Sequence, residues 1–535
     1  MVLGFIGVLL SLVFLIGMAY RGHSVVAIAP IAALIAVVFS GAPALATYTQ
    51  IFMPALGGFI INFFPLFLAG AIFGRLMSVS GYAEDLARWI PRVFGAKQAI
   101  LVTALVTTLL TYGGVSAWVI AFTVFPIAKP LFRHANVSMK LMPAAIALGI
   151  FTFATAALPG SPQIHNAIPT RYFDTTTFAA PLLGILGAIV TFSLGMAWLK
   201  YRERALLAKG EGYAEISTST IDAGVGVDSD PDAARDPGGG TESGGSAVVN
   251  NRRDGTPLPG SAAASSASLA TASAVTARTA VISHAAPFVP SAETRMPMAE
   301  VSRRGLVGLL PILVVVVVNA LFVYVISPMI DTSYLAEVKF GATTLQAVLG
   351  VWAVTLGLVA AGVVIFVLKP ANFARYVSSL TEGARNAVLP VFTTASEVGY
   401  GAVIASVAVF AVMRDSLFDV SSNPLIVGVL ATAVISGITG SSSGGLSITL
   451  QTFGEQLAQM AQDQGISAEF MHRVIAMASV SFDSLPHNGA IVTLLLVCGL
   501  THRQAYKDIG VVTVIVPFLG VLSVLFLGMA FPFLT

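Results

Sequence analysis

Four short stretches of small polar residues interrupt segments that are otherwise apolar. They read TYGGVSA at 111–117, LPGSPQIHN at 158–166, GSSSGGLS at 440–447 and DSLPHNG at 483–489. Glycine and proline in such positions break helices, and a broken helix leaves backbone N–H and C=O groups free to bind a ligand. None of the four stretches contains lysine or arginine. These residue types favour a small polar ligand held by hydroxyls, amides and backbone groups rather than by fixed cations.

An anion would suit the amino ends of the half-helices that follow the breaks, because free N–H groups and the helix dipole favour negative charge there. The alternative role for the small residues is close helix packing. The predicted substrate-binding residues are Gly113, Gly114, Ser116, Ser161, Gln163, His165, Asn166, Ser441, Ser442, Ser443, Gly444, Gly445, Ser484, His487 and Asn488.

Three of the residues at the breaks can ionise. Asp483 is the only acidic one, and His165 and His487 lie beside the two break prolines. Ionisable groups at membrane depth are rare and mark transport pathways. Asp483 could accept a coupling proton, ligate a cation with serine hydroxyls, or cap the next half-helix. The histidines could carry a proton, bind substrate, or pair a freed carbonyl. Glu397, in the middle of the apolar stretch TTASEVGYG, is a further candidate.

The composition places these breaks in a membrane. The chain has 535 residues, of which 56% are hydrophobic and only 10% are charged, whereas soluble proteins carry about 25% charge. Many apolar runs reach the 18 or more residues that span about 30 Å of hydrocarbon. The predicted spans are 3–20, 24–40, 57–77, 141–170, 178–199, 305–328, 343–367, 386–413, 474–500 and 510–531.

Several classes of partner and processing are disfavoured. The basic residues are scattered between apolar runs, so the net charge of +2 predicts no nucleic-acid binding. The single Cys498 offers neither a disulfide framework nor a cysteine metal site. No cofactor or metal is expected. The first apolar run is followed, not preceded, by its first positive charge, Arg21, which predicts a retained span rather than a signal peptide.

The chain divides into two membrane segments, 1–200 and 301–535, joined by residues 201–300. The joining segment is rich in Ala, Ser, Thr, Gly and Pro, which predicts a disordered linker. The two halves share three landmarks in the same order. Pro65-Leu66-Phe67 recurs as Pro390-Val391-Phe392, Gly113-Gly114 as Gly444-Gly445, and Leu158-Pro159 as Leu485-Pro486. The halves are therefore predicted to be repeats.

The basic residues predict that the repeats are inverted. If 98–130 and 423–454 are re-entrant hairpins, each half has five full spans, an odd number. An outside N-terminus then puts all but four of the 28 Lys and Arg inside, together with the linker, and also places the C-terminus outside. The four left outside are Arg171, Lys339, Arg414 and Arg473. The predicted fold is an all-α polytopic membrane protein of two inverted repeats, each with five spans, a hairpin and a broken helix. Matching broken helices in inverted repeats are typical of a transport site at the membrane midplane.

At these residues the chain resembles the gluconate:proton symporter (GntP-type) permeases of the ion transporter superfamily. Within that family the stretches SGITGSSSGGLSITLQTFG and SFDSLPHNGAIVTLL are most similar to the 3-hydroxybutyrate permease branch. The aldonate-type members have His-x-x-x-Pro-Pro-His-Pro-Gly-Pro at the first broken helix. Here FATAALPGSPQIHN keeps Pro159, Gly160 and Pro162 but lacks the flanking histidines, and Phe482 replaces the asparagine of Asn-Asp-Ser.

The resemblance implies a homodimer in a bacterial inner membrane, with a scaffold domain and a transport domain that moves as an elevator. It implies proton coupling; sodium coupling occurs elsewhere in the superfamily. The departures from the aldonate pattern favour a short hydroxy or keto monocarboxylate such as 3-hydroxybutyrate, with gluconate as the alternative.

Two other classes of function fit less well. Asp483, Ser484 and His487 lie too close together around a proline to form the line of nucleophile, base and orienting group that a hydrolase needs. No enzyme activity is therefore expected. A channel would need charge rings or a carbonyl filter, and the sequence shows no such pattern. A secondary carrier of a small organic anion accounts for the breaks best.

Overall fold

The computed structural model describes residues 2–214 and 297–535, except Gly22, Ala96, Ser116, Val409, Ala411, residues 413–418 and His487. In these residues every regular element is a helix. Most of the predicted linker, residues 215–296, lies outside the described residues.

The first half contains both long and short helices. They are α1 (Val2–Tyr20), α2 (Val25–Ser40), α3 (Ala44–Thr47), α4 (Met53–Val79), α5 (Tyr82–Phe94), α6 (Ala99–Tyr112), α7 (Ala117–His134), α8 (Met142–Ile150), α9 (Phe153–Ala156), α10 (Ile164–Ala167), α11 (Thr170–Phe173) and α12 (Pro181–Ala208). A π-helical turn, Tyr48–Phe52, joins α3 to α4.

The second half also contains helices of very different lengths. Its helices are α14 (Met298–Leu321), α15 (Leu345–Leu368), α16 (Phe373–Ser406), α18 (Pro424–Thr439), α19 (Ser442–Asp463), α20 (Ala468–Ser479), α21 (Gly489–Cys498), α22 (His502–Gly510) and α23 (Val516–Ala530). Among the described residues, seven helical segments are long and apolar enough to cross a membrane: 44–79, 139–156, 181–208, 298–329, 345–368, 370–406 and 502–530. The predicted class, an all-helical multi-pass membrane protein, is confirmed.

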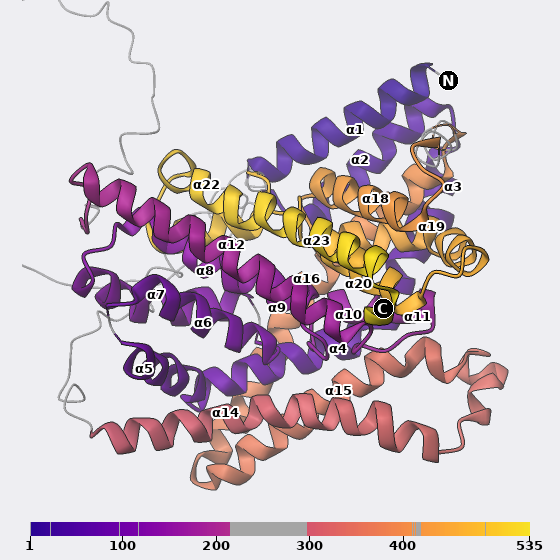
Figure 1. The fold of residues 1–535 in the computed structure, drawn as a ribbon. Coiled ribbons are helices and arrows are strands. Elements are labelled where there is room, and N and C mark those ends of the chain that lie inside the picture. The colour runs from indigo at the N-terminus through magenta and orange to yellow at the C-terminus, as the bar shows by residue number, and fades with distance from the viewer. Residues whose placement is uncertain are drawn as a thin grey trace, which may run out of the picture. The chain divides into compact units, whose positions relative to one another are not determined.

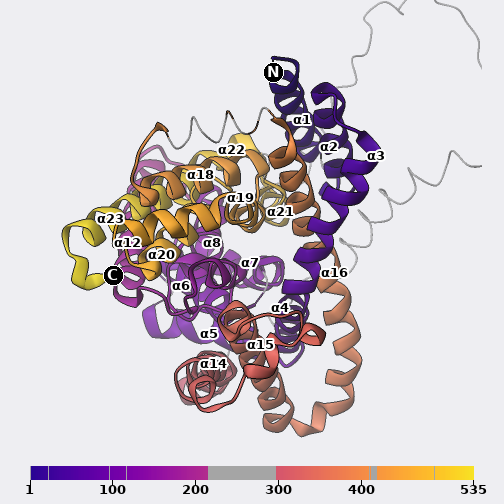
Figure 2. The ribbon, with the colours of Figure 1, turned by 90° about the vertical axis from the view of Figure 1, so that its right-hand side faces the viewer.

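Six long helices form what we call the first helix group: α1, α2, α4, α14, α15 and α16. The longest two, α4 and α16, pack along each other, and α2 packs on α16 as α15 packs on α4. α1 then pairs with α2, and α14 pairs with α15. Figures 1 and 2 show α1 and α2 at one end of the α4–α16 pair and α14 and α15 at the other. Many large side chains on these helices are exposed and apolar, among them Ile61, Val317 and Val363, which suits contact with lipid.

The helices α6 to α12 and α18 to α23 form what we call the second helix group. α6 packs on α7 and α8, α18 packs on α19 and α20, and α12 lies along α23. Small residues allow these close approaches: a Cβ on Gly445 of α19 would collide with the backbone of Ser436 on α18, and one on Gly149 of α8 would collide with Thr107 on α6. α12 and α23 run side by side in Figure 1.

Helices are interrupted in all four polar stretches. Residues 113–116 separate α6 from α7, and 440–441 separate α18 from α19. The predicted span 141–170 is a series of short helices from α8 to α10, and 474–500 is divided between α20 and α21. Two features were not predicted: α12 continues past residue 200 to Ala208, and the amphipathic α5 packs against α14.

Candidate functional site

The amino end of α19 is the most polar of the helix ends at the breaks. Gly440 ends α18 in the left-handed conformation, with φ of 63°, so the chain can reverse within two residues. Ser441 caps α19 with its hydroxyl, which accepts a hydrogen bond of 3.2 Å from Gly444 N. The side chains of Ser441, Ser442 and Ser443 are half-buried. We call residues 440–444 the α19 tip.

A histidine from the first half of the chain reaches the α19 tip. His165 lies on α10 and is 8% exposed, and its Nε2 lies 2.8 Å from Ser442 Oγ. Its other ring nitrogen, Nδ1, is buried and has no hydrogen-bond partner among the described residues. A buried polar atom without a partner is unfavourable unless a ligand or water completes it. The Nδ1 atom of His165 is therefore a candidate hydrogen-bonding atom for a ligand or a water molecule at the tip.

Asp483 lies on the other side of the same serine. Its Oδ1 accepts a hydrogen bond of 3.1 Å from Ser484 Oγ, and the Ser442 hydroxyl also interacts with its carboxylate. Asp483 is 3% exposed. Ser442 thus links a histidine of one half to a carboxyl group of the other half.

Asn488, rather than Asp483, caps the helix that follows the second break. Its Oδ1 accepts from Ala490 N at 2.7 Å and from Ile491 N at 3.0 Å, so Asn488 is the cap of α21. Its Nδ2 donates to Gly440 O and to Asp483 O, both at 2.9 Å. Asp483 is therefore not a helix cap, and Asn488 fastens the second broken helix to the α19 tip.

Three polar side chains of the first broken helix donate hydrogen bonds to backbone carbonyls. Ser161 Oγ donates to Ala154 O at 2.9 Å, and Gln163 Nε2 donates to Thr111 O at 2.7 Å. Asn166 Nδ2 donates to Leu158 O at 3.1 Å. These bonds supply partners for carbonyls that the breaks set free, as a membrane interior requires.

The glycines of the first hairpin have a packing role. A Cβ on Gly113 would collide with Ile312 of α14, and one on Gly114 would press on Leu358 of α15 and on Pro162. Gly114 also has φ of 85°, which favours glycine.

The predicted binding residues therefore fall into three sets. The structure brings together at the α19 tip His165, Ser441, Ser442, Ser443, Gly444, Asp483, Ser484 and Asn488. Packing or backbone contacts elsewhere engage Gly113, Gly114, Ser161, Gln163, Asn166 and Gly445. Ser116 and His487 lie outside the described residues.

Arg473 is a buried hydrogen-bonding centre. We expected it on the outer side, just before the predicted span 474–500; it lies within α20 and is fully buried, which the sequence did not predict. Its guanidinium donates to Ala179 O from Nε at 3.0 Å and Nη2 at 2.6 Å, and from Nη1 to Ala156 O and Asn166 Oδ1, both at 2.8 Å. Because the bonds go to neutral oxygens on both sides of the first break, Arg473 fixes the broken helix to α20. Its position directly before the apolar run VIAMASV was the available signal.

Glu397 also meets the α19 tip. It is 3% exposed on α16, and a Cβ added to Gly444 would collide with its carboxylate. Ser441 interacts with this carboxylate, but Oε2 is buried and without a hydrogen-bond partner among the described residues. Glu397 comes from the first helix group, whereas the tip belongs to the second.

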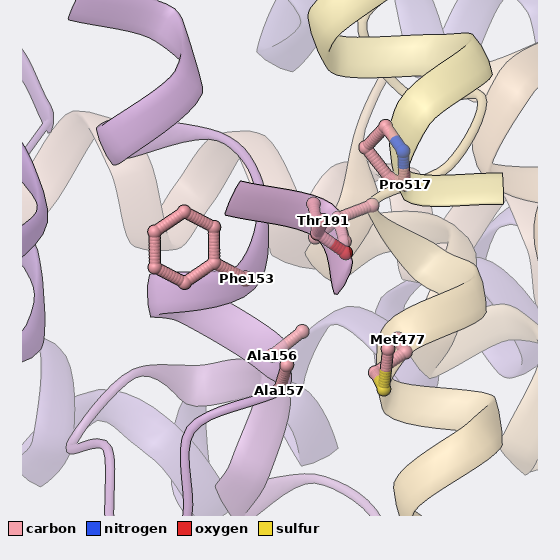
Figure 3. Close-up of a pocket in the computed structure, with 7 residues that line it drawn as sticks. Phe153, Ala156, Ala157, Thr191, Met477 and Pro517 are labelled. Carbon is pink, nitrogen blue, oxygen red and sulfur yellow. The ribbon is translucent and has the colours of Figure 1, made fainter. Parts of the chain in front are cut away.

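A separate cavity lies between α9, α12, α20 and the start of α23 (Figure 3). Phe153, Ala156, Thr191, Met477 and Pro517 are among its lining residues, and its volume is about 10 Å³. That volume is room for about one water molecule. The cavity is nearly apolar and too small for an organic anion, so it is not the candidate site.

An all-helical membrane fold, with broken helices whose ends gather buried polar side chains, is the architecture of a transporter. No family model matches the chain. It is 36% identical over 515 residues, 95% of each chain, to "Uncharacterized transporter YxjC" of Bacillus subtilis (strain 168). A shorter match, 30% identical over 144 residues, covers 27% of this chain and 32% of an "Uncharacterized transporter" of Haemophilus influenzae.

The chain belongs to the same transporter family as YxjC. It is a multi-pass membrane transporter.

Replacing Arg473 tests its structural role. We expect Arg473→Met to destabilise the protein by about 1–3 kcal/mol for each acceptor left without a donor. Arg473→Lys keeps the charge but lacks the planar fork, and we expect only partial rescue. Thermal unfolding in detergent measures both. Arg303→Met, at an exposed position of α14, is the control; a stability loss no larger than that of the control would contradict the role.

Proposed function

We propose that the chain is a proton-coupled symporter of a short hydroxy or keto monocarboxylate, such as 3-hydroxybutyrate, and that the anion binds at the α19 tip. It would belong to the gluconate:proton symporter family and to its 3-hydroxybutyrate permease branch. The observation that carries the proposal is the linkage of His165 and Asp483 through Ser442 at a helix amino end.

The free backbone groups of α19 favour an anion. Of the first N–H groups, Ser441 N donates to Ser436 O and Gly444 N donates to Ser441 Oγ. The N–H groups of Ser442 and Ser443 have no acceptor within the helix, because they lie at its start, and they can donate to a ligand. They add to the positive end of the helix dipole. A carboxylate bound there would lie beside His165, whose Nδ1 lacks a partner among the described residues.

The composition of the tip supports a small substrate. Its hydroxyls come from three serines, and the buried guanidinium of Arg473 is fully engaged with neutral oxygens elsewhere. An anion held without a fixed cation can also be released readily. A short acid with one hydroxyl or keto group could form a hydrogen bond with His165 or with a serine of the tip.

Asp483 is the proposed coupling group. It interacts with Ser442 and Ser484, both in the second helix group, so it would travel with the α19 tip. A proton on Asp483 would accompany the anion and remove the repulsion between two neighbouring carboxylates. Sodium in place of the proton is the alternative for this group.

Paired contacts support two inverted repeats. α1 packs on α2 as α14 packs on α15, and α6 packs on α8 as α18 packs on α20. α4 packs on its counterpart α16, and α12 on its counterpart α23. Such matching contacts fit two repeats related by a two-fold axis, and the distribution of Lys and Arg favours an axis in the membrane plane, which inverts one repeat. We assign the scaffold to the first helix group and the elevator-type transport domain to the second.

The remaining organisation is proposed from the sequence and from the resemblance to the GntP-type permeases. We propose repeats at 1–200 and 301–535 and a cytoplasmic linker at 201–300, into which α12 extends as far as Ala208, with both termini outside and a homodimer in a bacterial inner membrane. The distribution of Lys and Arg supports the orientation.

Uptake into proteoliposomes tests the function. With a proton gradient, the reconstituted chain should accumulate 3-hydroxybutyrate, and a sodium gradient alone should drive no uptake. Gluconate competing better than 3-hydroxybutyrate at equal concentration would replace the proposed substrate with an aldonate. Uptake of neither anion under either gradient would reject the proposed function.

Asp483→Asn tests the coupling. The amide keeps the shape but cannot ionise, so we expect gradient-driven accumulation to fall to background while exchange of labelled for unlabelled substrate continues. Asp463→Asn makes the same change at an exposed position near the end of α19 and should behave as wild type. Accumulation by Asp483→Asn against the gradient would exclude Asp483 as the coupling group.

Thiol labelling tests the inverted arrangement. His134→Cys lies at the end of α7 and Gln462→Cys near the end of α19, both at exposed positions, while the native Cys498 is buried. An impermeant reagent added outside intact cells should modify Gln462→Cys and spare His134→Cys. Modification of both from one side would refute the inverted repeats.

A further inference from the structure

Glu397 is the one buried carboxyl group that the proposed mechanism leaves unused at the α19 tip. It lies on α16, between two residues that contact the same helix. Thr394 Oγ1 is 3.4 Å from Ser443 Oγ, and a Cβ on Gly401 would collide with Ile448. Positions 394, 397 and 401 share one face of a helix. Glu397 is therefore held against the first turn of α19.

The carboxylate of Glu397 occupies the place that suits a bound anion. It packs against Gly444 in the first turn of α19 and interacts with the capping residue Ser441. Its Oε2 is buried without a hydrogen-bond partner among the described residues, although the residue is only 3% exposed. Among the described residues, no ion pair includes Glu397. The positive end of the helix dipole is the compensating charge that the contacts provide.

Two carboxylates cannot share this helix end without strong repulsion, because like charges at hydrogen-bonding separations disfavour each other's ionised form. We propose that Glu397 is an internal competitor for the substrate's carboxylate. When ionised it holds the amino end of α19, and it must take up a proton and give way when the anion binds there. This rests on the proposed function, because it assumes the α19 tip is the anion site.

The other titratable groups near Glu397 are few. Through the tip serines it faces His165 and Asp483, and on its own helix Tyr400 follows one turn later, with its hydroxyl 2.9 Å from Ser11 Oγ. The π-helical turn before α4 adds Tyr48. α2 contains no ionisable side chain, and α4 contains only Arg75, which pairs with Glu382. Substrate affinity should therefore fall as pH rises and Glu397 ionises, with Asp483 and His165 adding their own contributions.

Binding measured against pH tests this. With the purified full-length chain in detergent, the Kd for 3-hydroxybutyrate is measured from pH 5 to 9, and gluconate is measured in parallel. Glu397→Gln cannot ionise. We expect it to bind more tightly than wild type at alkaline pH and to reduce the slope of log Kd against pH by about one, that is, about tenfold per pH unit.

Two further variants make the result decisive. Glu382→Gln removes an acid from the exposed face of the same helix and should leave the slope unchanged. Glu397→Asp still titrates, but its carboxylate is one methylene farther from α19, so affinity at alkaline pH should rise above wild type; it also serves if Glu397→Gln does not fold. A wild-type slope in Glu397→Gln, or binding lost in Glu397→Gln but retained at wild-type affinity in Glu397→Asp, would overturn the proposal.

The outcome is separate from that of the proposed function. Failure of the function would appear as absent uptake in vesicles, whereas failure of the competition would appear as an unchanged pH slope of binding in detergent. Wild-type protein that binds neither anion would overturn the competition as well, because no anion site would then exist at the α19 tip.

Discussion

The need to pair backbone groups at helix breaks, away from water, governs this structure. Each break frees carbonyls and N–H groups that lipid cannot satisfy. Tyr112 Oη donates to Pro159 O at 2.9 Å, and Tyr506 Oη donates to Ser484 O at 3.0 Å. Asn319 of α14 donates to Gly160 O at 3.2 Å. At the α19 tip two buried side chains, His165 and Glu397, each keep an atom without a hydrogen-bond partner among the described residues, which is why we propose the ligand there.

The pairing also joins the two halves of the chain. Arg473 of the second half holds the first broken helix, and His165 of the first half reaches the serines of the second hairpin. The candidate site therefore forms only when both halves fold together. Glu397 adds a contact from α16, so the α19 tip lies where the two helix groups meet. Movement of one group against the other would change the surroundings of a bound anion.

Much of this could be predicted from the sequence, because hydropathy and glycine–proline punctuation are local signals. The helical class, the four breaks and the cluster of His165, Ser442 and Asp483 were within reach of such signals. The hydrogen-bond partners could not be predicted. Ser161, Gln163 and Asn166 were predicted to bind substrate, and in the structure they donate to carbonyls that only the folded chain brings near them. The burial of Arg473 could not be predicted, because the carbonyls that it binds lie near it only in the folded chain. Glu397 was a candidate because it lies in an apolar stretch, but the sequence did not show its contact with α19.

A substrate that occupies the α19 tip during transport, as we propose, should protect the tip from chemical modification. Ser443→Cys places a thiol at a half-buried position of the tip, and its rate of modification by a small thiol reagent can be followed with and without 3-hydroxybutyrate in a transport-competent variant. We expect the anion to slow modification of Ser443→Cys and to leave the rate at His134→Cys unchanged. Equal rates at Ser443→Cys with and without saturating transported substrate would show that the substrate does not occupy the α19 tip.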